Sequence, residues 1–331
     1  MREKVQQALD ELGYRPNMLA RGLRQGRTGI ITLLVPQITV PYFGELAHEI
    51  VEQASARGFT VMIDETDGDP EREIALLKVA GGSSWVDGVL LSSLGLEEGV
   101  LGALKSTLPV VLLGEHTADE VLDHVGIDNE RAATDAVEFL IRSGRTRIAA
   151  IGGMGEASDR TSRPRIDGYH AALRGAGMAI DPQLYAATPD YTRGSGMDAV
   201  TQLLSFAEAP DAIFCFSDDL ALGALRQLHN AGLRVPADVS VVGFDDVDGS
   251  RFTIPSLTSV SPDKSELART ALEMLIERID GSMVPARDMR VGHTLIVRES
   301  TGEITVESAS ETAAETAAES SASAIHGVVT Q

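Results

Sequence analysis

The sequence predicts an α/β protein built from two doubly wound parallel-sheet lobes, preceded by a short helical segment. Three observations support this fold class. Short apolar runs typical of strands covered on both faces alternate with amphipathic helix patterns along most of the chain. The alternation runs through two successive rounds, and the second begins near Ile148. At 331 residues the chain is long enough for two domains with full cores.

The first round opens with the apolar run Ile30–Val35, which predicts a buried strand. Further strands are expected at residues 59–63, 86–91, 110–113 and 124–127. Helices are expected at residues 43–57, 69–79 and 129–143, the second of which has a proline in its first turn.

The second round repeats this pattern, with strands expected at residues 148–151, 183–187, 212–216 and 239–243. Its helices are expected at residues 164–175, 193–206 and 218–232. A strand at 257–260, a helix at 263–279 and a strand at 294–298 close the fold. We therefore expect a first lobe of residues 29–144 plus 261–283 and a second lobe of residues 145–260 plus 284–301. Residues 302–331 are acidic and rich in Ala and Ser, so a disordered tail is expected there.

Composition excludes several classes of protein. The hydrophobic fraction of 43% and the charged fraction of 23% are ordinary for a soluble globular chain. Cys215 is the only cysteine, which favours a reducing compartment, and no apolar run has the length of a membrane span, so a cytoplasmic protein is expected. We expect no metal site, because the seven histidines show no pair at ligand spacing.

No cofactor and no enzymatic activity are predicted. The glycines at residues 152–155 follow a strand but lack the third glycine of a dinucleotide-binding loop. Neither a Walker A motif nor a nucleophile elbow occurs in the sequence. An acid–base or nucleophile constellation is also not evident from the residues.

The first 28 residues differ in charge from the rest. The whole chain has a net charge of −21, whereas residues 1–28 carry six basic and three acidic side chains, a net +3. Residues 2–12 predict an amphipathic helix, and residues 14–17 (YRPN) predict a helix stop and restart. Residues 18–25 then form a short helix pattern in which arginines surround Leu19 and Leu23. This basic head suits a small phosphate-contacting module on an acidic body.

Polar and aromatic side chains follow the predicted strand ends. Open parallel sheets bind ligands outside the carboxyl ends of their strands, so two such lobes place their candidate residues around one crevice. Arginine, carboxylates and aromatic rings together suit a polyhydroxylated ligand or a polar ring. The candidates are Tyr42, Phe43, Asp128, Arg165, Tyr191, Ser217, Asp219 and Asp245.

Several long segments carry a resemblance to a known family. They are LDELGYRPNMLARGLRQGRTGIITLLVP, PYFGELAHEI, VDGVLL, DRTSRPRIDGY, FSDDLALGALRQLHNAGLRVPADVSVVGFDD, TIPSLTSV and TLIVREST. The chain resembles the lactose-repressor (LacI/GalR) family of transcriptional regulators over about residues 2–301. The resemblance implies a homodimeric repressor with periplasmic-binding-protein-like lobes. Its partners would be operator DNA and a small effector, with no membrane.

The resemblance assigns roles in the crevice. Arg165 matches the main effector-binding arginine of the family, Asp245 the acidic residue opposite it, and Tyr191 the aromatic residue that stacks on the ligand. The remaining candidates match positions around the same ligand: Tyr42 and Phe43 at the first-lobe wall, Ser217 and Asp219 beside the polar contact, and Asp128.

The resemblance also assigns the basic head. Residues 17–25 match the hinge helix that enters the minor groove, and Leu23 matches the side chain wedged between central base pairs. The residues expected to contact DNA are Tyr14, Arg15, Asn17, Ala20, Arg21, Leu23 and Arg24. The first two helices of the family's headpiece have no match here, so a start placed too late, a fragment or a shortened sensor are the alternatives. Base-specific binding is then expected to be poor and salt-sensitive.

Each assignment has a structural alternative. Leu23, Tyr42, Phe43 and Tyr191 could serve packing alone, Arg165 could be a surface charge at a helix start, and Asp245 could belong to an ordinary turn. A stand-alone solute-binding protein is the alternative function, and an enzyme the third. A sugar or sugar derivative is the favoured effector, a nucleobase remains open, and inducer and corepressor action are not distinguished.

Overall fold

The computed structural model describes residues 27–82, 85–93, 108–114, 122–153 and 162–302. The expected headpiece and hinge helix, up to residue 26, and the expected tail from residue 303 lie outside these ranges. In the described part of the chain, no helix combines the length and apolar character needed to cross a membrane.

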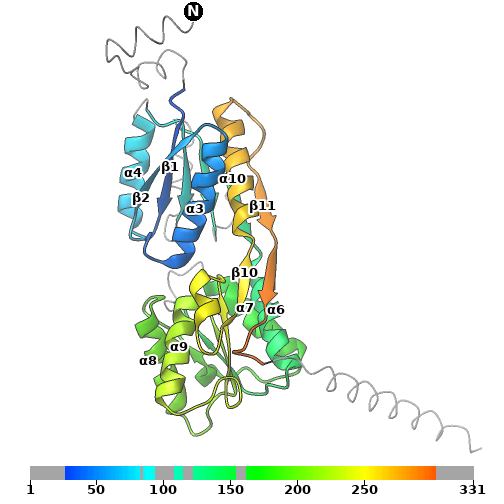
Figure 1. Cartoon of the computed structure of the whole chain (residues 1–331). Coiled ribbons are helices and arrows are strands. Elements are labelled where there is room, and N and C mark those ends of the chain that lie inside the picture. Colours follow the sequence, from blue (N-terminus) through cyan, green and yellow to red (C-terminus); the bar gives the residue numbers. More distant parts are fainter. Residues whose placement is uncertain (1–26, 83–84, 94–107, 115–121, 154–161, 303–331) are drawn as a thin grey trace, which may run out of the picture.

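The first lobe is a parallel six-stranded sheet covered by helices on both faces (Figure 1). Its strand order is β11-β5-β4-β3-β1-β2, with β1 Ile30–Val35, β2 Thr60–Glu65, β3 Gly88–Ser92, β4 Val110–Leu113, β5 Asp123–Ile127 and β11 Asp288–Val291. Helices α3 (Pro41–Ala56) and α10 (Lys264–Ile279) pack on the face that carries Leu33. Helix α4 (Pro70–Gly82) packs on the face that carries Leu34. Alternate residues of β1 thus enter two cores, which explains its unbroken apolar run.

The second lobe repeats the design with the order β12-β10-β9-β8-β6-β7. Its strands are β6 Ile148–Ile151, β7 Tyr185–Ala186, β8 Ala212–Cys215, β9 Ser240–Phe244, β10 Thr258–Pro262 and β12 His293–Ile296, of which β12 is antiparallel. Its helices are α6 Asn129–Arg142, α7 Ser162–Gly175, α8 Arg193–Leu204 and α9 Asp218–Asn230. The predicted fold class, two parallel-sheet α/β lobes, is confirmed.

Two elements lie in a different lobe from the one expected. Helix α6 packs on α7, and its Ala133 and Val137 belong to the second-lobe core, although residues 129–144 were expected in the first lobe. Strand β11 pairs with β5 in the first sheet, although residues 284–301 were expected in the second. The sequence of β11, DMRV, is only four residues long and half polar, unlike the continuous apolar runs by which the strands of this sheet were predicted. The apolar face of α6 does not reveal which lobe it will cover.

Two local expectations also differ from the structure. The strand expected at residues 183–187 is shorter, because Pro182–Leu184 forms a 3-10 helix capped by Asp181 and only Tyr185–Ala186 pairs in the sheet. A second 3-10 helix, η2 (Asp248–Phe252), was not expected at all.

Buried ionic contacts hold β11 on the first sheet. Asp123 is 2% exposed, and both its oxygens accept hydrogen bonds from Arg278 and Arg287. Burial alone would raise the pKa of Asp123, but these arginines lower it below its ordinary value. The His124 ring reaches Asp288 Oδ1 at 2.6 Å and Gly114 O at 2.8 Å. One of the places where the chain crosses between the lobes lies between β11, in the first sheet, and β12, in the second (Figure 1).

Candidate functional site

Arg165, in the first turns of α7, lies where three chain segments meet, one after a strand of the first lobe and two at strand ends of the second. It is 6% exposed. Its Nε donates to Asn129 Oδ1 at 3.0 Å and its Nη1 donates to the carbonyl of Phe216, while its guanidinium carbon lies 3.7 Å from the centroid of the Phe244 ring. The structure therefore places Arg165 in the interior beside the strand ends. The surface-charge alternative is wrong.

The three contact residues connect Arg165 to other candidates. Asn129 follows Asp128, Phe216 precedes Ser217, and Phe244 precedes Asp245. The ends of β5, β8 and β9 thus converge on one guanidinium, as expected for the carboxyl edge of parallel sheets. Four of the predicted effector residues therefore lie at or next to one point: Asp128, Arg165, Ser217 and Asp245.

Asp128 and Ser217 have structural duties at this edge. Asp128 is exposed and caps α6, where its Oδ1 accepts from the Arg131 amide at 2.9 Å. Ser217 is buried and caps α9, where its Oγ accepts from the Leu220 amide at 3.2 Å. Both caps fix a helix N-terminus, whose amides and dipole favour polar or anionic groups nearby.

Asp245 opens a turn of residues 245–248, here called the cleft turn. Asp245 has φ 107° and Asp246 has φ 47°, a backbone region that side-chain-bearing residues seldom adopt. The Asp245 amide donates to Val260 O at 2.8 Å, and the Asp246 amide donates to Ser259 Oγ at 3.0 Å. The backbone of the cleft turn is therefore fixed by β10, its neighbour in the sheet.

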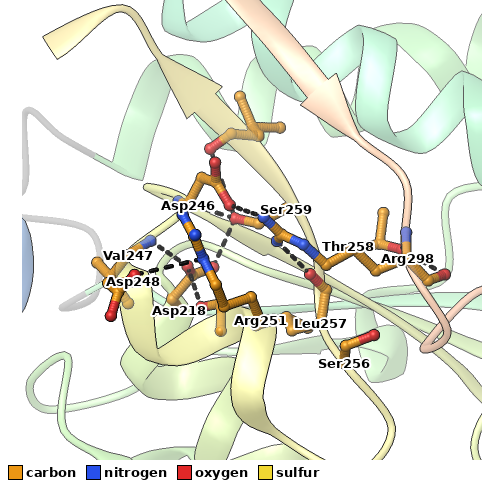
Figure 2. Close-up of polar contacts among 12 residues, drawn as sticks. Asp218, Asp246, Val247, Asp248, Arg251, Ser256, Leu257, Thr258, Ser259 and Arg298 are labelled. Carbon is orange, nitrogen blue, oxygen red and sulfur yellow. Dashed lines mark hydrogen bonds and ion pairs between the residues drawn. The ribbon is translucent and has the colours of Figure 1, made fainter. Parts of the chain in front are cut away.

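Asp218 is the buried carboxylate behind the cleft turn (Figure 2). Its Oδ2 accepts from the Val247 amide at 2.9 Å and from Ser250 Oγ at 2.6 Å, and its Oδ1 accepts from Ser259 Oγ at 2.6 Å. Desolvation by burial raises its pKa to about 6, against the lowering effect of these hydrogen bonds. Asp246 beside it pairs with Arg298 at 2.7 Å.

The first lobe reaches the cleft turn through α3 and the start of α10. Lys264 Nζ donates to Glu45 Oε2 at 2.6 Å and to the Asp246 carbonyl at 3.1 Å. Glu45 Oε1 accepts from the Asp248 amide at 2.7 Å. We call this set of contacts the lobe clasp, because Glu45 belongs to the first lobe and residues 246 and 248 to the second.

Tyr42 and Phe43 lie in the first turn of α3, beside the lobe clasp. Their rings meet edge to face with centroids 5.2 Å apart, and Lys264 Nζ lies 5.9 Å from the Tyr42 centroid. Both rings pack partly against the first-lobe core. The structure thus brings Tyr42 toward the cleft turn through Lys264, although packing accounts for part of its burial.

Tyr191 and Asp219 lie at the starts of α8 and α9. The Asp190 side chain accepts from the Thr192 amide and hydroxyl and from Ser195 Oγ, which fixes the loop that carries Tyr191. The hydrogen bonds from Ser195 and Thr192 lower the pKa of Asp190. Asp219 pairs with Arg193 at 2.8 Å, so its carboxylate joins α8 to α9. The Tyr191 ring packs partly against the second-lobe core.

The list of candidates lacks Asn129, Asp218 and Lys264. Asp218 follows the same strand end as Ser217 and Asp219, and Asn129 stands next to Asp128, so the strand-end rule covers both. Lys264 follows a strand end as well, at the start of the returning helix, and that position carried a usable signal. The predicted DNA contacts, all before residue 26, lie outside the described residues.

A hollow of about 330 Å³ lies on the α3 side of the lobe clasp. It is lined by Gly44, Glu45, His48, Glu49 and Lys264, none of which is a predicted effector residue. In the described ranges no group of three or more His, Cys, Asp or Glu side chains is placed to hold a metal ion. The structure brings together a buried guanidinium and carboxylates, which can form hydrogen bonds, and aromatic rings beside them.

Comparison with known proteins gives matches along nearly the whole chain. Residues 137–301 match the family model described as a periplasmic binding protein-like domain. The HTH-type transcriptional repressor CytR of Escherichia coli K12 is 34% identical over 301 residues, covering 91% of this chain and 87% of that protein. Catabolite control protein A of Priestia megaterium is also 34% identical over 301 residues, covering 91% and 90%.

Solved structures agree with these matches. A transcriptional regulator of the LacI family from Sanguibacter keddieii superposes with a TM-score of 0.77 at 38% identity, covering 84% of this chain and all of that one. A complex of the transcriptional regulator CelR with cellobiose superposes with a TM-score of 0.74 at 32% identity, covering 90% of each chain.

Proposed function

The chain belongs to the LacI family of transcriptional regulators, and from this we propose that it is a repressor whose affinity for DNA is set by a small polar effector bound between its lobes. Relatives at 34% identity are named as a transcriptional repressor and a control protein, which supports a ligand-responsive regulator and not an enzyme. The observation that carries the proposal is the position of Arg165, whose guanidinium reaches Asn129, Phe216 and Phe244 at three strand ends.

We propose a sugar or sugar derivative as the effector. Carboxylates accept hydrogen bonds from hydroxyl groups, a guanidinium donates in a fork, and aromatic rings pack on apolar sugar faces. Arg165, Asp245, Tyr42 and Tyr191 would supply these groups. The CelR complex with cellobiose supports this class, as does a LacI-family regulator from Lactobacillus casei solved with sucrose, at 26% identity and a TM-score of 0.73. A nucleobase would use the same kinds of groups and is tested beside sugars.

The effector would act by favouring one arrangement of the lobes. A ligand shifts a conformational equilibrium only through unequal affinity for the two states. Arg165 and Asp245 lie in the second lobe and Tyr42 in the first, and the lobe clasp joins the two sides through Glu45. A ligand that touches both sides therefore has different contacts in the open and closed forms. The change would reach DNA through the hinge segment, residues 17–25, with Leu23 as the minor-groove wedge.

We propose that the chain acts in the cytoplasm as a homodimer. Large apolar side chains are exposed on both lobes: Met62 and Ile63 on β2, the edge strand of the first sheet, and Phe252 and Ile254 in and beyond η2, where Ile254 is 97% exposed. Exposed apolar edges of this kind favour association with another chain. Sedimentation equilibrium at micromolar concentration should give twice the chain mass, and a monomer at that concentration would contradict the proposal.

A thermal-shift screen with sugars, sugar phosphates and nucleobases tests the effector, because a ligand that binds only the folded state raises the melting temperature. DNA binding is measured with the same protein by fluorescence anisotropy on duplex DNA at low salt, with and without each hit. Repressor function predicts a hit that changes DNA affinity. A hit that leaves the DNA affinity unchanged would instead favour the stand-alone solute-binding protein, which shares the periplasmic-binding-protein-like domain.

A further inference from the structure

We propose that Asp218 is a positioning residue for the cleft: it fixes the cleft turn, and through it both the direction of the Asp245 side chain and the contact between the lobes at Glu45. The part that concerns the effector rests on the function proposed above. The part that concerns the lobes does not, because the contacts of the lobe clasp join protein atoms alone.

The first argument concerns the hydrogen bonds that the backbone amides of the cleft turn donate. The Val247 amide donates to Asp218 directly, and the Asp246 amide donates to Ser259 Oγ, which in turn donates to Asp218. The Asp248 amide then donates to Glu45 across the lobes. Asp218 therefore holds, directly or through one hydroxyl, the two amides that precede the interlobe contact (Figure 2).

The second argument is backbone conformation. Asp245 and Asp246 both have positive φ, a strained backbone region in which a residue persists only when its surroundings over-determine its conformation. Strand β10 supplies part of that constraint through the Val260 carbonyl and Ser259 Oγ. Asp218, at the start of α9, supplies the rest by binding Ser259 Oγ and the Val247 amide. A side chain at position 218 that cannot accept these hydrogen bonds would let the turn relax toward ordinary backbone dihedral angles. The Asp245 side chain and the Asp248 amide would then point in other directions.

The third argument is that the fold makes room for this carboxylate. A Cβ atom added at Gly243 would lie 2.2 Å from Asp218 Oδ1. Glycine in the penultimate position of β9 thus leaves the space that the carboxylate occupies. The side chain is fully buried, so it is not available to bind the effector directly and acts through the turn.

The fourth argument concerns the ionisation state of Asp218 that its hydrogen bonds require. All three partners of Asp218 donate to it, which matches an ionised carboxylate. A protonated carboxyl must itself donate one bond. A serine hydroxyl can rotate to accept it, but the Val247 amide cannot. Because burial raises the pKa of Asp218 to about 6, this reorganisation falls at mildly acidic pH.

The effect of protonating Asp218 must be distinguished from the effects of other ionisable groups nearby. The cleft turn brings Asp246 with Arg298 and Asp248 with Arg251, and β8 brings the Cys215 thiol, whose pKa is raised by burial. The first lobe brings Glu45 with Lys264, and His48 beside them in the hollow. His48 is the histidine of this group, so it needs its own variant.

The test measures the distance between the lobes without ligand or DNA. Spin labels are placed on exposed surfaces of α3 and α9 through Ser55→Cys and Asn230→Cys, while buried Cys215 stays unlabelled. Distance distributions by electron–electron resonance are compared at about pH 8 and pH 5. We expect a narrow distribution for the parent at high pH that broadens at low pH. In Asp218→Ala it should be broad at both.

Asp218→Asn keeps the shape and removes the titration, so its distribution should not change with pH. In His48→Gln the pH response of the parent should persist. Asp211→Asn is the matched control: Asp211 binds the Thr146 and Arg147 amides at the opposite edge of the same sheet, and its loss should leave the interlobe distance unchanged. A narrow distribution in folded Asp218→Ala, or an undiminished pH response in Asp218→Asn, overturns the proposal. Neither result would bear on effector or DNA binding.

Discussion

The guanidinium carbon of Arg165 lies 3.7 Å from the centroid of the Phe244 ring, so the first turns of α7 rest on the end of β9. Such cation–π contacts contribute about 2 kcal/mol when desolvated. Phe244 is the residue before Asp245, and Asp245 opens the cleft turn. Arg165, which is expected to bind the effector, therefore packs on the residue that directly precedes Asp245, the carboxylate expected to face it.

Gly243→Ala should destabilise the second lobe. The new Cβ would meet Asp218 Oδ1 at 2.2 Å and Leu257 at 3.0 Å, and overpacking a buried site typically costs about 1–3 kcal/mol. Chemical denaturation should show this loss. Gly249→Ala is the control, because an added Cβ there meets nothing within 4 Å; equal stability of the two variants would contradict the close packing.

Asp218→Asn should change how stability depends on pH. The folded pKa of Asp218, about 6, lies above its ordinary value of 3.8, so between these values the folded state binds more protons than the unfolded state. The contribution of this group is therefore greatest below pH 3.8 and is lost as the pH rises to about 6. From about pH 4 to pH 7 the free energy of unfolding of the wild type should fall relative to Asp218→Asn by on the order of 3 kcal/mol.

Urea denaturation of both proteins at several pH values measures that difference directly. The relative stability of the two proteins should be constant above about pH 7. A difference that does not vary with pH would mean that the folded protein does not raise the pKa of Asp218.

Lys264 and Glu45 should be energetically coupled. Their side chains are 12% and 32% exposed and their charged atoms lie 2.6 Å apart. A double-mutant cycle with Lys264→Met and Glu45→Gln should give a coupling of about 1 kcal/mol by denaturation. The exposed pair Arg163 and Asp167, 3.0 Å apart, is the control and should couple by about 0.3–0.5 kcal/mol. A lobe clasp no stronger than this surface pair would be an incidental contact.

Leu23→Ser should reduce DNA bending and DNA affinity together. An apolar wedge kinks duplex DNA by partly unstacking a base step, and a serine cannot replace it. Bend angles from circular-permutation gel shifts, made with a chain that carries a complete headpiece, measure this. Leu19→Ser, one turn earlier on the same predicted helix, is the comparison. An unchanged bend in Leu23→Ser would remove this residue from the mechanism.

The sequence predicted the main-chain plan well, because buried parallel strands are written as continuous apolar runs. Strand β1 and strand β4 were predicted at their observed limits for this reason. Lobe membership was harder. Strand β11 is held by contacts of Asp123 and His124 with residues about 160 positions away, and periodicity cannot detect such partners.

The candidate site was predictable as a set of strand ends but not as a network. Arg165, Asp128, Ser217 and Asp245 follow from the rule that parallel strands bind ligands at their carboxyl edge. The roles of Asp218 and Lys264 depend on which neighbours the folded chain supplies. Asp218 and Asp219 look alike in the sequence, yet one is buried under the cleft turn and the other pairs with Arg193.

The measurement that tests the central claim most directly is titration calorimetry of the tightest ligand from the thermal-shift screen, with wild type and with Arg165→Lys. Lysine keeps the charge but cannot reproduce the fork of hydrogen bonds or the stacking on Phe244. We predict at least a tenfold loss of affinity, about 1.4 kcal/mol, in a variant that remains folded. Equal affinity of both proteins for that ligand would place the effector elsewhere and contradict the account.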